Sequence, residues 1–185
     1  QHILPALRLT LICLVVFVGL YSLLILGIAQ LFPNKGQGET LSVNNKVVGY
    51  KLEGQNFTAD NYFNSRPSAA GYNAAGSSGS NKGPSNPEYL KTVQDRIDSF
   101  MVHNPTVKKE DIPAELVTAS GSGLDPDLSR EGAYVQCARV AKARNISIDK
   151  INALVAQHIQ KPLLRLFGTE KINILQLNIE LDKLK

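Results

Sequence analysis

Two aspartates separated by one proline are the residues best suited to acid–base chemistry in this chain. Asp125 and Asp127 flank Pro126, directly before a segment with helical spacing. A carboxylate pair can divide the roles of general acid and general base, as a hydrolase requires. A hydrolase also needs an activated nucleophile, and no GxSxG elbow occurs. The simpler interpretation is that both acids cap and charge the first turn of the following helix, where the helix dipole favours negative charge.

A short Gly/Ser segment, Ser120-Gly121-Ser122-Gly123, is the candidate for holding a phosphate group. Backbone N–H groups of glycine-rich loops cradle phosphates, but the nucleotide-binding pattern GxxxxGK[ST] includes a lysine that is missing here. The Asp-Lys-Thr-Gly sequence of a phosphorylated pump is absent as well. Direct ATP binding at these four residues stays an open hypothesis, and no catalytic residue is assigned.

Metal and disulfide chemistry have little support in the sequence. The three histidines, His2, His103 and His158, are widely dispersed, and no CxxC pair occurs. Cys13 falls in an apolar N-terminal segment and Cys137 in the later part of the chain, so a disulfide between them is not expected. We expect Cys137 to be a small buried hydrophobic residue rather than a reactive thiol. No metal site is assigned.

Composition excludes one large class of function. The formal net charge is +4, from 20 Lys and Arg against 16 Asp and Glu, and no block is rich in basic residues. Nucleic-acid binding needs clustered basic residues, so it is not expected. About 150 residues follow the apolar segment, which is enough for one domain with its own core.

An apolar segment at residues 9–31 indicates where the protein works. Its 23 residues include no Asp, Glu, Lys or Arg, and at about 1.5 Å per residue a helix of this length crosses a bilayer core of about 30 Å. A secretory signal peptide has a shorter apolar region, of about 7–15 residues. A buried soluble helix would have too little protein around it. We expect a tail at residues 1–8, one transmembrane helix at 9–31 and a soluble domain at 32–185.

The charges around this segment say little about its orientation. Arg8 precedes the segment, and Lys35 and Lys46 follow it with Glu39 between them. The positive-inside rule counts lysine and arginine near the helix ends, and here the counts nearly balance. We expect the N-terminus inside and the large domain outside, an orientation that charge alone does not determine.

Small and polar residues within the apolar segment lie on one face. At 100° per residue, Gly19, Ser22 and Gln30 fall within a stripe of about 80°. Such a stripe suits close packing against another membrane helix. The alternative, a lone anchor with incidental small residues, stays open.

The rest of the chain mixes short strands with amphipathic helices, which predicts an α+β domain. Strands are predicted at 46–52, with a bulge at Gly49, and at 115–118 and 172–174. Helices are predicted from Ser129 to Arg144, from Ser147 to Ile159 and from Ile174 to Leu184.

The clearest helix signal follows a segment with no regular pattern. Residues 69–87 are rich in Gly, Ser, Asn, Ala and Pro, and a loop of this length is either functional or disordered. Asn86 then suits an N-cap and Pro87 the first helical position. The apolar residues that follow predict a helix packed into the core and ending at Asn104-Pro105: Leu90, Val93, Ile97, Phe100 and Met101.

Several blocks, taken in order, form a specific pattern over nearly the whole chain. They are Pro5-Ala6-Leu7, Gly54-Gln55-Asn56-Phe57, Tyr62-Phe63, Arg66-Pro67-Ser68-Ala69, Gly79-Ser80-Asn81, Ser85-Asn86-Pro87, residues 112–126, Arg139-Val140-Ala141, Ala143-Arg144, and Asn173, Leu175, Leu177-Asn178 and Leu181-Asp182. The set resembles the C subunit of the bacterial Kdp-type potassium-transporting P-type ATPase. Residues 74–83 depart from that family by a slight expansion, and Cys137-Ala138 stands where an apolar residue and a proline are expected.

The resemblance implies an accessory, non-catalytic subunit of a high-affinity potassium uptake complex in the bacterial inner membrane. Implied partners are a channel-like potassium subunit, a P-type ATP-hydrolysing subunit and a small single-span subunit, besides membrane lipid. The family is held to assist assembly and to act as a catalytic chaperone that raises the pump subunit's affinity for ATP. It also places the soluble domain in the periplasm, out of reach of cytoplasmic ATP. We therefore expect ATP to act through the pump subunit, with a membrane-tethered periplasmic hydrolase as the alternative function.

Partner contacts are expected at the stripe of the apolar helix and in the loops that carry the resemblance. One residue, Arg66, offers a fork of donors beside a rigid proline, which suits a partner carboxylate or carbonyl. An ion pair within the domain is an equal alternative for Arg66. The full set of interface candidates is Gly19, Ser22, Gln30, Gln55, Asn56, Phe57, Tyr62, Arg66, Ser120, Ser122 and Asp125.

Overall fold

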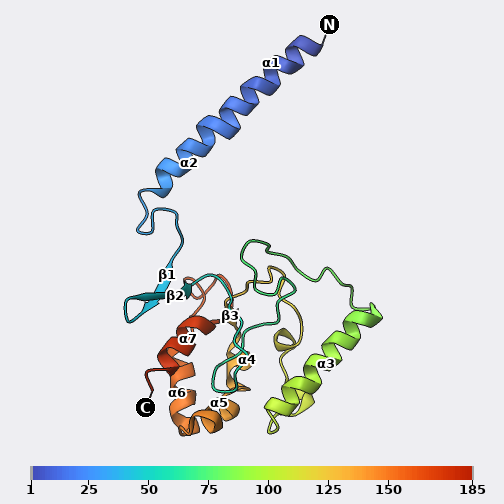
Figure 1. Ribbon diagram of the computed structural model, residues 1–185, viewed down its shortest axis with the longest axis vertical. Coiled ribbons are helices and arrows are strands. Elements are labelled where there is room, and N and C mark those ends of the chain that lie inside the picture. Colours follow the sequence, from blue (N-terminus) through green and yellow to red (C-terminus); the bar gives the residue numbers. More distant parts are fainter. Residues whose placement is uncertain (1, 185) are drawn as a thin grey trace. The chain divides into compact units, whose positions relative to one another are not determined.

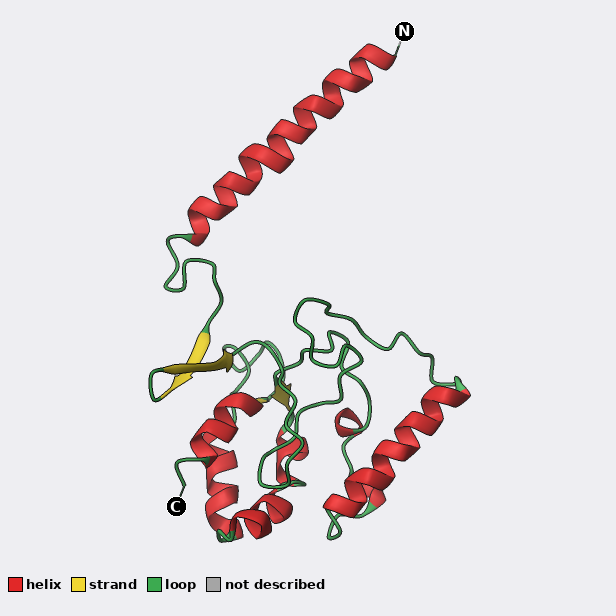
Figure 2. Cartoon of the chain, viewed as in Figure 1, coloured by secondary structure: helices red, strands yellow, loops and turns green. Residues whose placement is uncertain are grey.

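The structure is a computed structural model that describes residues 2–184. It contains two compact units, Gln1–Glu39 and Thr40–Lys185. The first is one long helix with the segment that follows it, and the second combines short helices and small strands with long loops (Figures 1 and 2). The second unit confirms the predicted α+β class.

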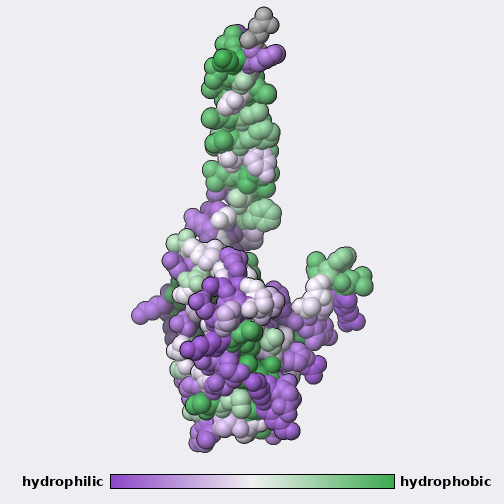
Figure 3. All heavy atoms as spheres, turned by 90° about the vertical axis from the view of Figure 1, so that its right-hand side faces the viewer, coloured by the Kyte–Doolittle hydropathy of each residue, from purple (hydrophilic) through white to green (hydrophobic). Residues whose placement is uncertain are grey.

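The N-terminal helix is continuous from Ile3 to Ala29 and has no buried residue. It consists of α1 (Ile3–Cys13), a π-helical segment η1 (Leu14–Leu20) and α2 (Tyr21–Ala29). Its surface is apolar along most of its length (Figure 3). Within the described residues it is the one helix long and apolar enough to cross a membrane. The helix begins inside the expected tail and ends two residues before Leu31.

A two-stranded hairpin opens the second unit. Strand β1 (Thr40–Val43) pairs antiparallel with β2 (Lys46–Tyr50). The turn residues Asn44 and Asn45 have φ of 51° and 63°, the left-handed conformation that a tight hairpin turn requires. The sequence predicted β2 but not β1. The register shifts opposite Val48, so the predicted bulge lies directly beside Gly49.

Four short helices surround the hydrophobic core. They are α4 (Arg130–Tyr134), α5 (Cys137–Arg144), α6 (Ile148–His158) and α7 (Ile174–Leu181). Residues with at most 1% exposure fill the space between them: Phe63, Leu128, Ala133, Val140, Ile151, Val155, Ile172, Ile174, Leu177 and Leu181. The helices at 147–159 and 174–184 are confirmed, whereas the single helix expected from Ser129 to Arg144 is two helices that break at Val135 and Gln136.

One predicted strand is wrong, and another gains an unpredicted partner. Residues 115–118 do not form a strand. The first two belong to a 3-10 helix, η3 (Ala114–Leu116), and the other two come directly after it. The Thr118 side chain and backbone N–H both bond to the Ala114 carbonyl, so the local turn takes the groups that a strand would offer to a neighbour. The strand predicted at 172–174 is β4 (Ile172–Asn173), and it pairs with β3 (Asp127–Leu128).

Helix α3 (Pro87–His103) forms as predicted but is not a core helix. The Asn86 side chain accepts a hydrogen bond from the Tyr89 N–H and caps it. None of its residues is buried, and Leu90 is 52% exposed, so the predicted core packing is wrong. Phe100 alone of the five apolar residues packs against the core. Loops lie between α3 and helices α4–α7 (Figure 1).

Candidate functional site

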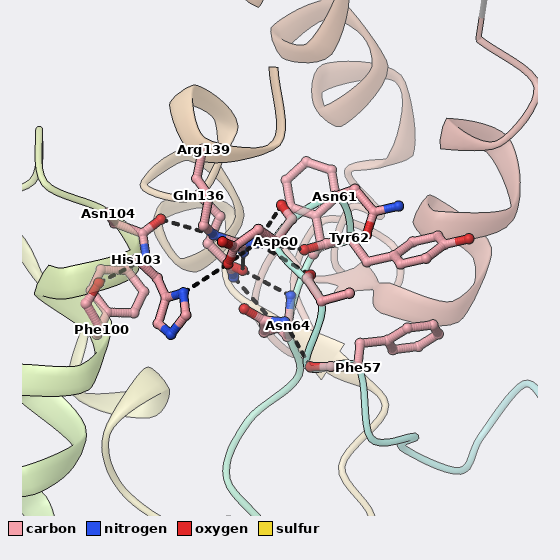
Figure 4. A network of polar contacts seen from close by, with 12 residues as sticks. Phe57, Asp60, Asn61, Tyr62, Asn64, Phe100, His103, Asn104, Gln136 and Arg139 are labelled. Carbon is pink, nitrogen blue, oxygen red and sulfur yellow. Dashed lines mark hydrogen bonds and ion pairs between the residues drawn. The ribbon is translucent and has the colours of Figure 1, made fainter. Parts of the chain in front are cut away.

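Loop 55–66, which carries five of the expected interface residues, is held by the buried side chain of Arg139 (Figure 4). Arg139 lies on α5 and is 6% exposed. Its Nη1 donates to the carbonyls of Asp60, at 2.6 Å, and Tyr62, at 3.0 Å, and its Nε donates to Asn104 Oδ1 at 3.1 Å. Burial lowers the pKa of Arg139, and the charge of Asp60 opposes that shift. One guanidinium thus joins α5, loop 55–66 and the end of α3.

Two buried amides hold the backbone of the same loop. Gln136 accepts from the Asn64 N–H at 2.8 Å and donates to the Asn64 carbonyl at 3.3 Å. In the same way, Asn178 accepts from the Phe63 N–H at 2.9 Å and donates to the Phe63 carbonyl at 3.0 Å. Gln136 Oε1 also accepts from Arg139 Nη2 at 2.7 Å. The amides take the place of a neighbouring strand, so the loop needs no sheet to satisfy its backbone.

A second arginine fixes the outer side of loop 55–66. Arg144 Nε donates to the Asn61 carbonyl at 2.6 Å, and Nη2 pairs with Asp182 Oδ1 at 2.6 Å. The guanidinium stacks 4.7 Å from the centre of the Tyr62 ring. The Tyr62 hydroxyl donates to Asp182 Oδ2 at 3.1 Å. Tyr62 is therefore held by Arg144 at its ring and by Asp182 at its hydroxyl while remaining half-buried.

The first part of the loop presents a mixed apolar and polar surface. Asn56 is exposed, and Gln55 and Phe57 are half-buried. The Phe57 and Tyr62 rings lie 5.7 Å apart. Gln55 Nε2 donates to the Val48 carbonyl of β2 at 3.3 Å. Four expected interface residues are thus brought together at one edge of the second unit.

Arg66 and Asp125 form an ion pair within the domain, and both aspartates of the Asp-Pro-Asp sequence are engaged. Arg66 Nη1 lies 2.8 Å from Asp125 Oδ2, and Asp127 Oδ2 lies 2.6 Å from Lys171 Nζ. The expected helix cap is wrong: Ser129 caps α4, by accepting from the Gly132 N–H. Each carboxylate thus forms its own ion pair, one with Arg66 and the other with Lys171, and the two do not act as a pair. This arrangement gives the hydrolase alternative no support.

The Gly/Ser segment uses its own hydroxyls to close a turn. Ser120 is 2% exposed, and its Oγ accepts from the Gly123 N–H at 3.0 Å. Ser122 Oγ accepts from the Leu124 N–H at 3.0 Å. The N–H groups of Gly123 and Leu124 are therefore already bonded, and a phosphate would have to displace these bonds.

The long Gly/Ser-rich loop at 69–87 lies against that turn. The Ser77 hydroxyl donates to the Ser122 carbonyl at 2.9 Å. A Cβ on Gly79 would come within 2.9 Å of the Gly121 carbonyl oxygen, so only glycine permits this approach. The Tyr72 hydroxyl donates to the Arg66 carbonyl at 2.7 Å, and burial raises its pKa. The sequence left a functional or a disordered loop open, and these contacts argue against disorder.

A cleft of about 320 Å³ separates α3 from loop 55–66. Arg96 of α3 lines this cleft, and its Nη1 donates to the Val117 carbonyl at 3.1 Å. His103 Nδ1 lies 2.8 Å from Asp60 Oδ1 at the exposed rim (Figure 4). Among residues 2–184, no group of three or more His, Cys, Asp and Glu side chains has the arrangement of a metal site.

The expected stripe on the N-terminal helix lies in η1 and α2 and ends at Gln30, the C-cap of α2. Gly19 lies in η1, and nothing lies within 4 Å of the position its Cβ would take. The Ser22 hydroxyl approaches the Phe17 carbonyl at 3.5 Å, and Gln30 Nε2 approaches the Lys35 carbonyl at 3.4 Å. Gly19 leaves a shallow notch in an otherwise bulky apolar surface.

Sequence reasoning missed the residues that hold the loops. Gln136 received no role, and Arg139, Arg144 and Asn178 were noted only as parts of the resemblance. A signal was present: Asn178 follows Leu177 on the apolar face of its helix, and Gln136 precedes the buried Cys137. A polar residue on a buried face needs partners, so such positions predict hydrogen bonds to neighbouring loops.

Cys137 is buried as expected, at 2% exposure, and burial raises the pKa of its thiol to about 12. We predict that iodoacetamide at pH 8.5 modifies Cys137 only after denaturation, as measured by mass spectrometry of its peptide. Because the folded pKa exceeds the unfolded one, this thiol favours the folded state below about pH 9 and loses that effect as pH rises toward 12. Equal labelling of native and denatured protein would contradict this prediction.

The two units define a class of protein: an α+β domain that follows one apolar helix long enough to cross a membrane, and in which one buried arginine and two buried amides hold a long surface loop in place. The chain matches the family model described as KdpC, K+-transporting ATPase, c chain, over residues 3–183. It is 56% identical to the potassium-transporting ATPase KdpC subunit of Flavobacterium psychrophilum over 185 residues, which is all of both chains.

Similarity extends to more distant bacteria. The KdpC subunit of Bacteroides fragilis is 49% identical over 188 residues, covering 100% of this chain and 98% of that one. The KdpC subunit of Clostridium kluyveri is 40% identical, covering 94% and 90%. The chain therefore belongs to the KdpC family and is a subunit of a potassium-transporting ATPase complex. Membership in a transporter, with one apolar N-terminal helix, indicates a single-pass membrane protein.

Proposed function

We propose that this chain is a non-catalytic accessory subunit that assists assembly and stability of the potassium pump, with its large domain in the periplasm. The observation that carries the proposal is the Arg139 network. Its donors go to the backbone of loop 55–66 and to two side-chain amide oxygens. Buried charge here fixes the shape of a surface loop, which is what a protein-binding module requires.

The proposed interface has two parts, one on each unit. On the domain, Gln55, Asn56, Phe57 and Tyr62 present a surface held from beneath. On the helix, Gly19, Ser22 and Gln30 offer the small and polar stripe that suits a neighbouring membrane helix. Arg66, Ser120, Ser122 and Asp125 support the adjacent turn. Their contacts lie within the domain, so we propose that they shape the interface rather than touch the partner.

The proposed partners are a channel-like potassium subunit, a P-type ATP-hydrolysing subunit and a small single-span subunit. In this proposal a higher ATP affinity of the pump subunit arises indirectly, from stabilisation of the complex. The bonded state of the Gly/Ser turn supports an indirect role, because its serine hydroxyls already accept from the local N–H groups.

The helix stripe is tested by affinity purification of the tagged chain from gently solubilised membranes of cells grown at low potassium. Replacing Gly19 and Ser22 together with leucine fills the notch, and we expect recovery of the large partners to fall roughly tenfold, the effect of about 1.4 kcal/mol of lost packing. Leu24→Ala is the control on the same helix, about 140° around the axis from Gly19 and therefore outside the stripe. Unchanged recovery with the leucine variant would refute the stripe as a contact.

ATP binding is tested separately on the purified full-length chain in detergent. We expect isothermal titration to show no saturable binding at millimolar ATP. In the assembled complex, we expect omission of this chain to raise the ATP concentration needed for half-maximal activity. Saturable binding to the chain alone, lost on replacing Gly121 with valine, would instead place the nucleotide at residues 120–123.

A further inference from the structure

A hairpin between α6 and β4 displays large apolar side chains to solvent. Gln160 and Lys171 pair at its base, and Leu163 and Phe167 exchange two backbone hydrogen bonds of 3.0 Å near its tip. The tip residues are 63–79% exposed: Leu163, Leu164, Leu166 and Phe167. Figure 3 shows apolar side chains gathered at the end of an arm that stands out from the side of the domain. We name residues 160–171 the apolar hairpin.

The two residues at the tip are of types that turns in this backbone conformation rarely contain. Leu164 and Arg165 have φ of 53° and 60°, a left-handed conformation in which glycine or asparagine is favoured. A leucine there adds backbone strain and gains no packing within the domain, because it is 75% exposed. The apolar side chains at the tip are therefore explained by what they meet outside the domain, and not by the stability of the turn.

Charges around the tip are mostly positive and mostly unused. Lys161 and Arg165 are exposed, and neither side chain has a hydrogen-bond or ion-pair partner among the described residues. Lys171 at the base pairs with Asp127 at 2.6 Å, and Glu170 is the nearby acid in the sequence. Leucine and phenylalanine flanked by free lysine and arginine match the chemistry of an anionic lipid surface, where apolar groups enter the headgroup boundary and cations meet phosphates.

A bilayer is within reach of the domain in every copy of this chain. Residues 30–39 connect α2, which ends at Ala29, to β1, which begins at Thr40. Ten extended residues span at most about 35 Å. The tether holds the domain near the membrane at high effective concentration, so even a small apolar tip can stay engaged.

We propose that the apolar hairpin inserts its tip into the headgroup boundary of the bilayer that anchors the chain, with Lys161 and Arg165 on anionic lipid phosphates. The hairpin is then a second, reversible membrane contact beside the N-terminal helix. This contact limits how the domain turns on its tether. It goes beyond the accessory role proposed above, which does not depend on it.

The test uses the absence of tryptophan from the sequence. Phe167→Trp places the protein's single tryptophan, which can be excited selectively, at the tip, and Val102→Trp, at a side chain 77% exposed on α3, is the matched control. Each full-length variant is reconstituted alone into vesicles of phosphatidylcholine and phosphatidylglycerol. We expect blue-shifted emission, quenched by brominated lipid, for Phe167→Trp. We expect water-like emission, quenched by acrylamide, for Val102→Trp.

Charge is tested in the same vesicles by adding Lys161→Gln and Arg165→Gln to the Phe167→Trp variant. At about fivefold per cation, we expect the ratio of inserted to free tip to fall roughly 30-fold in anionic vesicles and to change little in pure phosphatidylcholine. Equal quenching of Phe167→Trp and Val102→Trp by lipid overturns the proposal. Protection of Phe167→Trp that arises only when the other pump subunits are present also overturns it, because the tip would then contact protein.

Discussion

Replacing Arg139 with alanine is expected to lower the free energy of unfolding of the domain by roughly 3–5 kcal/mol, as removal of one partner from a buried charged network does. The carbonyls of Asp60 and Tyr62 and the amide oxygens of Asn104 and Gln136 would each lose a donor. Unsatisfied buried acceptors cost about 1–3 kcal/mol each before the structure relaxes. Loop 55–66 would lose its main support, and recovery of the pump complex should fall with it.

The measurement is denaturant unfolding of the full-length chain in detergent, followed by tyrosine fluorescence, since the sequence contains six tyrosines and no tryptophan. Lys142→Ala is the control, because Lys142 lies on the same helix and is exposed. Arg139→Lys keeps the charge but has one donor atom where the guanidinium has three, so we expect an intermediate loss. A change below 1 kcal/mol for Arg139→Ala would show that the network does not hold the loop.

Replacing Phe63 with alanine is the second large effect, with an expected loss of roughly 3–5 kcal/mol. Phe63 is fully buried, and both its backbone N–H and its carbonyl form hydrogen bonds with the Asn178 side chain. Removing the ring leaves a cavity beneath loop 55–66 that the rigid backbone cannot close. The unfolding transition should shift, and partner recovery should fall only in proportion to the fraction of folded protein.

Phe57→Ala separates stability from partner binding. Phe57 is half-buried on the proposed interface, six residues before Phe63 on the same loop. We expect Phe57→Ala to cost far less stability than Phe63→Ala but to reduce partner recovery more at equal amounts of folded protein. Partner recovery that follows stability alone in both variants would remove Phe57 from the interface.

Much of the secondary structure was predictable because its signals are local. Asn86 and Pro87 start α3 as expected, and the apolar spacing of 147–159 and 174–184 gives α6 and α7. The errors arise where long-range contacts compete with local pattern. Strand β3 is two residues long and exists only because β4 lies beside it. Helix α3 carries an apolar face, but none of its residues is buried, and loops lie between it and the other helices of the domain (Figure 1).

The candidate site shows the same division. The resemblance supplied the loop residues Gln55, Asn56, Phe57 and Tyr62 in two blocks. The polar residues that hold the loop's backbone come from α5, its N-cap and α7, more than 70 residues later. Hydrogen bonds between side chains and backbone across that separation, such as Gln136 to Asn64, leave no periodic trace in the sequence. Only their burial on helical faces hints at them.

By itself, the sequence determined the membrane anchor, the family and the absence of a P-loop, because a long apolar run and ordered motifs are properties of the chain alone. The tertiary structure decided the roles of the charges. Arg66 and Asp125 pair with each other, Arg139 supports a loop, and the side chains of Lys161 and Arg165 on the apolar hairpin have no partner within residues 2–184. Charge interactions depend on distance and burial, which are known only once the chain has folded.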